Sequence, residues 1–189
     1  MPQTVGTREA ILERAVDLAS VEGLEALTIG RLAGEMSMSK SGLFRHFGSK
    51  EELQLATVAA AAERFVEEVV RPALEAEPGA PRLRALSDRY IGHLEQQVFA
   101  GGCFWGATAP EFDDRPGAVR DSIRDYFSAW SEGLANEART AGLPDPDQFA
   151  FELVALASGA NMRYRLFREE EAFTRARQGM ERLFDSPEA

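Results

Sequence analysis

Residues 28–50 read TIGRLAGEMSMSKSGLFRHFGSK, and they contain two short predicted helices. Thr28 and Ser39 each stand before a helical apolar pattern and can accept a hydrogen bond from the first turn as N-caps. The turn between the two helices falls at residues 36–38. Two short helices joined by a turn of three or four residues form a helix-turn-helix, whose second helix can enter the major groove of DNA.

The second of these helices leaves a polar, partly basic surface outside the core. Helical spacing turns Leu43 and Phe47 inward, whereas Lys40 and Arg45 are long donors that reach guanine O6 and N7 or phosphate. Gly42 lowers helix stability by about 1 kcal/mol relative to alanine, and close approach of the backbone to DNA is one reason for a glycine there. The candidate DNA-binding residues are Thr28, Arg31, Ser39, Lys40, Ser41, Gly42, Phe44, Arg45, His46 and Lys50. The alternative is a helical hairpin whose charges are simply solvated.

The sequence on both sides of this segment is also helical. A first helix ends at Gly23, and residues 49–52 (SKEE) form a capping box that begins a long helix ending near Pro72. Strand patterns are essentially absent. Further helices are predicted at about 82–99, 103–112, 117–141, 146–168 and 171–184. We therefore expect an all-α protein with a three-helix DNA-binding domain at residues 1–52 and a bundle of five to six helices at residues 53–189.

Composition restricts the classes to which this chain can belong. Its 189 residues carry a net charge of −10, yet residues 26–50 hold four basic residues, one acidic residue and both lysines of the chain. An acidic protein with one locally basic surface fits local rather than general binding of nucleic acid. No apolar run approaches the ~20 residues of a membrane span, the N-terminus lacks a secretory profile, and the single cysteine excludes an internal disulfide. We expect a cytoplasmic protein without a membrane partner.

The helix-turn-helix motif resembles that of a known family of regulators. Residues 23–33 (GLEALTIGRLA) and 39–53 (SKSGLFRHFGSKEEL) are similar to the DNA-binding domain of the TetR/AcrR family of transcriptional regulators. The resemblance implies a homodimeric repressor that binds a palindromic double-stranded DNA operator and leaves it when a small-molecule effector binds the C-terminal bundle. It also implies that bases are met by Lys40, Ser41, Gly42 and Arg45, and that the DNA backbone is held by Thr28, Phe44, His46 and Lys50.

Three positions depart from the usual pattern of this family. Ser37 stands where a turn glycine is common, although serine adopts a left-handed backbone less readily than glycine. Gly42 stands where threonine or serine is frequent. Phe44 replaces a frequent tyrosine, so no hydroxyl is available there for a phosphate. These departures bear on individual contacts and leave the predicted fold unchanged.

The bundle holds the candidate effector site, because members of the similar family bind a small effector there. Pockets are mostly apolar with a few placed polar groups. Aromatic and polarisable side chains of this kind gather in the bundle, and we expect a small hydrophobic or aromatic effector. The candidate residues are Phe65, Tyr90, His93, Cys103, Phe104, Trp105, Phe127, Trp130 and Met162. The alternative for each of them is a simple role in the core.

The last two helices form the candidate dimer surface. Small residues between Ala155 and Ala160 would let a partner helix approach residues 153–166 and 173–184 closely. The alternative is that these small residues pack only within one chain. Dimerisation would place two DNA-binding helices on half-sites one helical turn apart, about 34–36 Å.

Enzymatic readings have weaker support in the sequence. Cys103 with His93 could form a nucleophile and base, but a lone cysteine among glycines and aromatics is more often buried and inert. The acidic residues of 111–114 could hold a metal, although a solvated loop explains them more simply. No Walker-type glycine loop, H-E-x-x-H or G-x-S-x-G motif occurs. We expect no enzyme activity, metal or cofactor, and leave open a redox-sensing role for Cys103. A protein of another class, a helical small-molecule binder or enzyme that does not read DNA, is the alternative for the whole chain.

Overall fold

The computed structural model describes residues 7–185, and these residues form helices connected by turns and short loops. The one β-type contact among them is an isolated bridge between Phe99 and Gly102. The all-α prediction is confirmed. The helices are α1 (Thr7–Glu22), α2 (Ile29–Glu35), α3 (Lys40–Phe47), α4 (Lys50–Phe65), a π-helical segment (Val66–Val70), α5 (Arg71–Ala73), α6 (Ala80–Glu95), α7 (Phe104–Phe112), α8 (Ala118–Thr140), α9 (Pro146–Phe167) and α10 (Ala172–Phe184).

The chain divides into two compact units that do not follow the sequence in one stretch each. The first unit consists of the chain up to Arg64 together with Phe99–Asp125. The second consists of Phe65–Val98 together with the chain from Tyr126 onward. The first unit therefore contains the helix-turn-helix, α4 except its last residue Phe65, α7 and the beginning of α8. The domain boundary expected at residues 52 and 53 stays a prediction.

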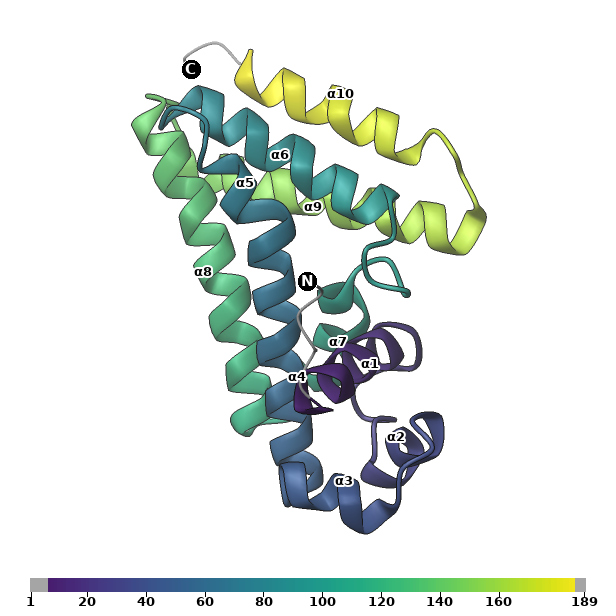
Figure 1. Ribbon diagram of the computed structural model, residues 1–189. Coiled ribbons are helices and arrows are strands. Elements are labelled where there is room, and N and C mark those ends of the chain that lie inside the picture. Colours follow the sequence, from purple (N-terminus) through teal and green to yellow (C-terminus); the bar gives the residue numbers. More distant parts are fainter. Residues whose placement is uncertain (1–6, 186–189) are drawn as a thin grey trace, which may run out of the picture. The chain divides into compact units, whose positions relative to one another are not determined.

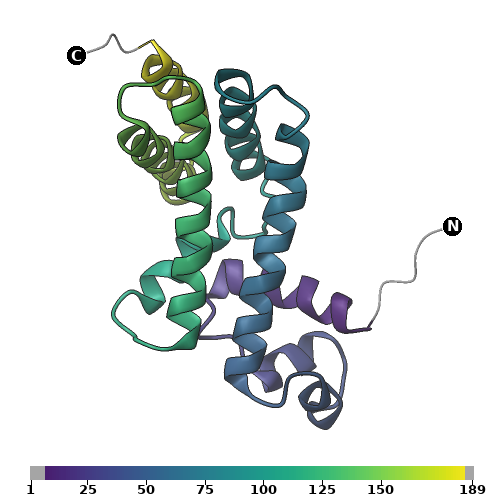
Figure 2. The ribbon, with the colours of Figure 1, turned by 90° about the vertical axis from the view of Figure 1, so that its left-hand side faces the viewer.

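Local capping explains why the helix-turn-helix forms where it does. Thr28 Oγ1 accepts a hydrogen bond from Arg31 N at 3.1 Å, and Ser39 Oγ accepts one from Gly42 N at 3.0 Å. Ser37 adopts a left-handed backbone with φ 53°, as its place in the turn predicted. Figure 1 and Figure 2 show α2 and α3 lying side by side near the beginning of α4. The predicted caps and turn are thus confirmed.

Buried apolar side chains from α1 to α4 and from the loop between α1 and α2 hold the first unit together. Ile11, Leu24, Leu32, Leu43 and Leu53 are fully buried, and each stabilises the fold by about 1.5–3 kcal/mol relative to an exposed side chain. Leu43 and Phe47, four residues apart on α3, both face the core, as helical spacing predicts. The opposite side of α3 is consequently free to meet a partner.

The long helix predicted from residue 49 to Pro72 is interrupted. After α4 ends at Phe65, five residues form a π-helical turn, and Pro72 then stands in the first turn of α5. Proline has no N–H to donate to the carbonyl four residues earlier, and its ring crowds that carbonyl. A wider turn before the proline removes this conflict. The helical segment ends at Ala73, close to the predicted end near Pro72, but the π-helical form of residues 66–70 was not predicted.

The end of α6 differs from the predicted one, whereas α9 ends at Phe167, one residue before its predicted end. A non-glycine residue adopts a left-handed backbone after each of these helices. Gln97 has φ 51° and follows α6, which ends at Glu95 rather than near residue 99. Arg168 has φ 57° and ends α9 at a place without a glycine or proline signal. In the second unit, α10 lies along α9 and α6 (Figure 1). This packing is close, since a Cβ built on Gly179 would lie 3.0 Å from the Leu156 side chain.

Candidate DNA-binding surface

The exposed side of α3 forms a shallow concavity with the first turn of α2. Its lining residues, which we call the α3 face, are Ile29, Gly30, Lys40, Ser41, Phe44 and Arg45. Phe44 is 53% exposed, an unusual position for a phenyl ring, whereas Leu43 beside it is fully buried. The α3 face therefore combines apolar and basic groups that are accessible to a partner.

Lys40 and Arg45 are the cations of this surface that remain available. Neither takes part in the ion pairs found among residues 7–185. Both side chains are exposed and carry long flexible stems. An ammonium or guanidinium group without a carboxylate partner can bind phosphate or the acceptor edge of guanine without first breaking an internal pair.

Arg31 is held differently, although it is also a predicted DNA-binding residue. Its Nη2 lies 2.6 Å from Glu22 Oε1, and its Nη1 donates to Glu35. These carboxylates raise the pKa of Arg31 above its usual value. Hydrogen bonds from Arg14 and then Arg31 lower the pKa of Glu35 from its usual 4.5 to about 2. The arginine therefore bridges α1 and α2 within the unit.

Lys50 is also occupied within the protein. Its Nζ donates to the backbone oxygen and to Oε1 of Glu25, each at 2.7 Å. The hydrogen bond from Lys50 is the largest cause of a lowered pKa at Glu25. Arg115 Nη1 lies 3.5 Å from the other oxygen of the same carboxylate. In this arrangement the ammonium group fixes the loop between α1 and α2.

The same loop is also held by Glu111, for which the sequence offers a metal ligand or, more simply, a solvated loop. Glu111 Oε2, from α7, accepts hydrogen bonds from Leu24 N at 2.7 Å and Glu25 N at 3.2 Å. Gln54 Nε2 donates to Leu24 O at 2.9 Å. We call Glu111, Gln54 and Lys50 the loop clamp. Nothing local in the sequence indicates this contact, because 87 residues separate Glu111 from Leu24.

The remaining predicted DNA-binding residues serve the local structure of the motif as well. Thr28 and Ser39 are N-caps, and Ser41 Oγ lies 3.3 Å from Ser39 Oγ. A Cβ built on Gly42 would lie 3.0 Å from Ser39 Oγ, so the glycine leaves room for that cap. The His46 ring lies 6.2 Å from the Phe47 ring and is half-buried. All ten predicted residues thus belong to one small region, but only some of them have free donors.

Four predicted effector residues come together in the second unit. The rings of Phe65, Tyr90 and Trp130 contact one another edge to face, with centroids 5.0–5.6 Å apart. The His93 ring lies 5.4 Å from Phe65 and is buried. Trp130 Nε1 is buried and has no hydrogen-bond acceptor among residues 7–185. These four side chains therefore form one aromatic cluster within the second unit.

The other predicted effector residues lie outside this cluster, three of them in the first unit and two in the second. Cys103, Phe104 and Trp105 belong to the first unit, where the Phe104 ring lies 5.2 Å from Trp105. Burial raises the pKa of the Cys103 thiol, which disfavours the nucleophilic thiolate. Met162 is half exposed on α9. Phe127 lines a separate shallow hollow with Phe151.

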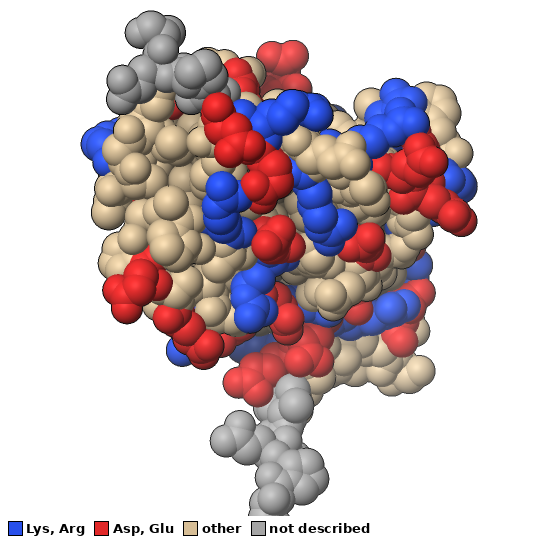
Figure 3. All heavy atoms as spheres, turned by 90° about the horizontal axis from the view of Figure 1, so that it is seen from above, with Lys and Arg blue, Asp and Glu red and all other residues tan. Residues whose placement is uncertain are grey.

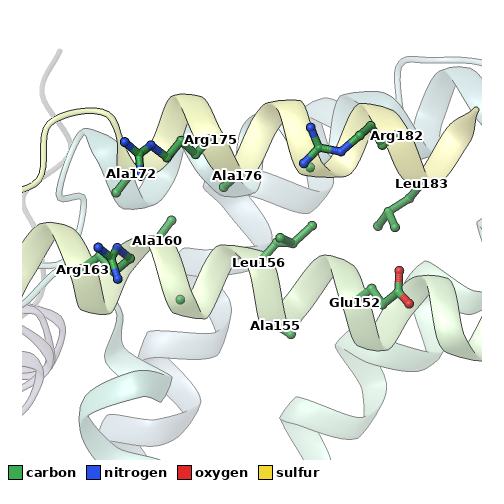
Figure 4. Close-up of a pocket in the computed structure, with 12 residues that line it drawn as sticks. Glu152, Ala155, Leu156, Ala160, Arg163, Ala172, Arg175, Ala176, Arg182 and Leu183 are labelled. Atoms are coloured by element: carbon green, nitrogen blue, oxygen red, sulfur yellow. The ribbon is translucent and has the colours of Figure 1, made fainter.

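The last two helices enclose a groove of about 590 Å³ (Figure 4). Small side chains of both helices form its floor, and arginines stand at its sides. The groove is lined by Glu152, Ala155, Leu156, Gly159, Ala160, Arg163, Ala172, Arg175, Ala176, Gly179, Arg182 and Leu183. Figure 3 shows Lys and Arg side chains interspersed with Asp and Glu side chains on the face seen from above. Ion pairs join α10 to α6, as in Arg177 with Glu95 at 2.6 Å and Arg84 with Glu181.

Two features absent from the described residues bear on other functions. Within residues 7–185, no three His, Cys, Asp or Glu side chains are grouped so that they could hold a metal ion. No helix in that same range has the length and apolar character needed to cross a membrane.

Comparison with known proteins identifies relatives of both halves of the chain. Residues 11–57 match the family model of bacterial regulatory proteins of the tetR family, and residues 79–180 match that of the tetracyclin repressor-like C-terminal domain. The HTH-type transcriptional regulator TcmR of Streptomyces glaucescens is 36% identical over 124 residues, which are 62% of this chain and 53% of TcmR. The matched stretch thus spans about half the length of that relative.

Solved structures agree with this in fold. A TetR transcriptional regulator from Chloroflexus aurantiacus has a TM-score of 0.86 at 26% identity, covering 95% of this chain and 94% of its own. The structure of AibR in complex with isovaleryl coenzyme A and operator DNA has a TM-score of 0.72 at 23% identity, covering 92% and 95%.

Proposed function

Because the chain belongs to the TetR family of bacterial regulatory proteins, we propose that it is a DNA-binding transcriptional regulator that acts as a repressor. A homodimer binds a palindromic operator, and a small effector bound in the C-terminal bundle releases it. The observation that carries this proposal is the α3 face, where Lys40 and Arg45 are exposed and outside the described ion pairs. These two cations lie beside the exposed Phe44 on the second helix of the helix-turn-helix, which is the helix that enters the major groove in this motif.

The proposed contacts divide by the availability of each donor. Lys40, Ser41, Phe44 and Arg45 enter the major groove, and Gly42 permits close approach of the α3 backbone. Thr28, Ser39 and His46 lie at the edge of this surface, where phosphates pass. Arg31 and Lys50 reach phosphate only by exchanging their carboxylate partners, so their main proposed role is to hold α2 and the loop in position.

The proposed dimer uses α9 and α10, whose groove presents small residues flanked by charge. Leu166 and Phe167 are 69% and 62% exposed near the end of α9, and a partner would cover such large apolar side chains. A symmetric pair places two α3 helices on half-sites about 34–36 Å apart. Within the chain, Gly179 of α10 packs against Leu156 of α9. This packing is compatible with a partner that binds the outer side of the two helices.

The proposed effector site lies at the aromatic cluster of Phe65, Tyr90, His93 and Trp130. An effector that separates these rings gains apolar contacts, and an acceptor atom on it would satisfy the buried Trp130 Nε1. A small hydrophobic or aromatic molecule has this chemistry. AibR, which shares the fold, binds an acyl coenzyme A together with operator DNA. Release follows only if the effector binds the DNA-free conformation more tightly than the DNA-bound one.

The proposal is tested by selecting duplexes from a randomised library with the full chain, and then measuring binding of the enriched duplex at low and high salt. We expect enrichment of a palindromic sequence and an affinity that falls with salt, because phosphate contacts release counterions. A protein that enriches no sequence, or whose binding does not respond to salt, would support the alternative of a small-molecule binder without DNA recognition. A cytoplasmic location belongs to the same proposal.

A further inference from the structure

The α3 face has two chemically different sides. Phe44 and Ile29 contribute carbon atoms, and Lys40 and Arg45 contribute positive charge. Lys40 and Phe44 are four residues apart on one helix, so they lie on the same side of α3 and about 6 Å apart along its axis. Base pairs stack about 3.4 Å apart, so two side chains with this separation meet base pairs no more than about two steps apart.

Gly30 determines where the Lys40 side chain can lie. A Cβ built on Gly30 would come within 3.2 Å of Lys40 Cε and 3.6 Å of Nζ, which is tighter than ordinary van der Waals contact for the first of these atoms. The stem of Lys40 therefore crosses the first turn of α2 over a position without a side chain. Gly34 on the same helix has no atom within 4 Å of a built Cβ, so a methyl group there disturbs nothing.

The chemistry of Phe44 narrows what it can recognise. A phenyl ring offers neither a hydrogen-bond donor nor a strong acceptor, so in the major groove it can distinguish bases only through apolar contact. Among the four bases, thymine alone presents a methyl group there, while guanine presents the O6 and N7 acceptors that suit a lysine. An exposed ring beside a free ammonium group thus matches a thymine close to a guanine.

We propose that Phe44 contacts the 5-methyl group of a thymine in each half-site, and that Gly30 positions Lys40 to donate to a guanine within about two base pairs of it. This inference rests on the proposed function and specifies which base features the α3 face selects. Gly30 acts as a positioning residue, because it would influence the base preference through Lys40 without touching DNA.

The test begins with the duplex that the wild-type chain enriches from the randomised library. Each thymine is replaced in turn by deoxyuridine, which removes only the methyl group. We expect one thymine per half-site at which this replacement weakens binding about fourfold, since burial of one methyl group contributes about that factor. In Phe44→Ala the two bases should bind alike at that position. Phe44→Leu should keep part of the difference, which separates lost apolar contact from general loss of binding.

The role of Gly30 is tested by repeating the selection with Gly30→Ala, with Gly34→Ala as the matched control. We expect Gly30→Ala to keep the wild-type unfolding temperature, but to lose the preference for guanine near the sensitive thymine. Gly34→Ala should enrich the wild-type sequence. A Gly30→Ala variant with unchanged base preference would overturn the positioning role.

Failure of this inference is distinguishable from failure of the proposed function. If a sequence is enriched but no deoxyuridine substitution depends on Phe44, the ring contacts only the DNA backbone, and thymine reading is overturned while DNA recognition stands. If the wild-type chain enriches no sequence, both the proposed function and this inference are wrong.

Discussion

The α3 face and the loop clamp belong to the same compact unit, yet they use their polar groups in opposite ways. Lys50, in the clamp, donates twice to Glu25, and Glu111 accepts from two backbone N–H groups. On the α3 face, Lys40 and Arg45 have no such partners among the described ion pairs. A polar group that is satisfied within the chain stabilises the fold, whereas one left to solvent is available to a partner. Counting basic residues does not separate these two uses.

The largest effect is expected from Gly101→Ala, in the same unit as the clamp. A Cβ built on Gly101 would lie 1.7 Å from the backbone oxygen of Ser20, so the backbone itself must move. We expect a loss of about 3 kcal/mol or more in the free energy of unfolding, measured by urea denaturation. Gly133→Ala is the control, because nothing lies within 4 Å of its built Cβ, and it should be neutral or stabilise by up to about 1 kcal/mol. Equal stability of the two variants would show that the Ser20 contact does not constrain the fold.

On the α3 face, Lys40→Ala and Arg45→Ala should each weaken binding of the enriched duplex about tenfold to a hundredfold. Their unfolding midpoints should stay near that of the wild-type protein, because neither side chain takes part in a described ion pair. Arg120→Ala removes the same charge from an exposed position on α8 and should change affinity little. If all three variants bind alike, the contrast between free and satisfied cations has no bearing on DNA.

The loop clamp is tested by Glu111→Ala, which leaves the N–H groups of Leu24 and Glu25 without their acceptor. We expect a loss of about 2 kcal/mol in the free energy of unfolding, and a smaller loss in Glu111→Gln, whose amide oxygen can still accept. Asp114→Ala, three residues further along an exposed loop, should have little effect in the same urea titration. A similar loss in Asp114→Ala would point to general sensitivity of the loop instead of the clamp.

The smallest effect is expected when the pH is lowered and the stability of the fold is measured. The pKa of Glu35 is about 2 in the folded protein, against 4.5 for an ordinary glutamate. Its ion pairs therefore stabilise the fold above pH 4.5, and this stabilisation is lost as the pH falls towards 2. Wild-type protein should therefore lose more stability over this interval than Glu35→Gln, measured by thermal unfolding at several pH values. The difference should shrink in high salt, because these charges are exposed. Glu51→Gln serves as the control, because Glu51 is outside the described ion pairs. If both variants differ from the wild-type protein by the same amount, the acid-dependent loss of stability does not come from the ion pairs of Glu35.

Much of the fold could be predicted because its determinants are local. Thr28, Ser39 and Ser49 cap helices that begin within one or two residues of them, and each cap is visible in a few letters of sequence. The α3 residues were likewise predicted from spacing within a single helix. The contact of Glu111 with Leu24 could not be predicted, because it joins distant segments and leaves no periodic trace. The same reason applies to Lys50, whose partner Glu25 lies 25 residues away. Arg31 differs, because its pair with Glu35 has the i,i+4 spacing of a helix and could have been predicted from the sequence.

The effector candidates show the corresponding limit in the second unit. Composition indicates aromatic candidates throughout the bundle, but it does not predict which of them contact one another. Phe65, Tyr90 and Trp130 come from separate segments and pack against one another, while Phe104 and Trp105 pack in the first unit. The π-helical turn after Phe65 was also missed, since a proline predicts disruption of a helix but not the form that it takes.

Cys103 gives the protein an internal reporter. It is the single cysteine of the chain, it is buried, and its sulfur accepts a hydrogen bond from Gly106 N at the beginning of α7. A thiol reagent can therefore modify this atom only during moments when the surrounding segment opens. The labelling rate of one natural residue then measures how often the unit that carries the α3 face loosens, with and without DNA, and no probe has to be introduced.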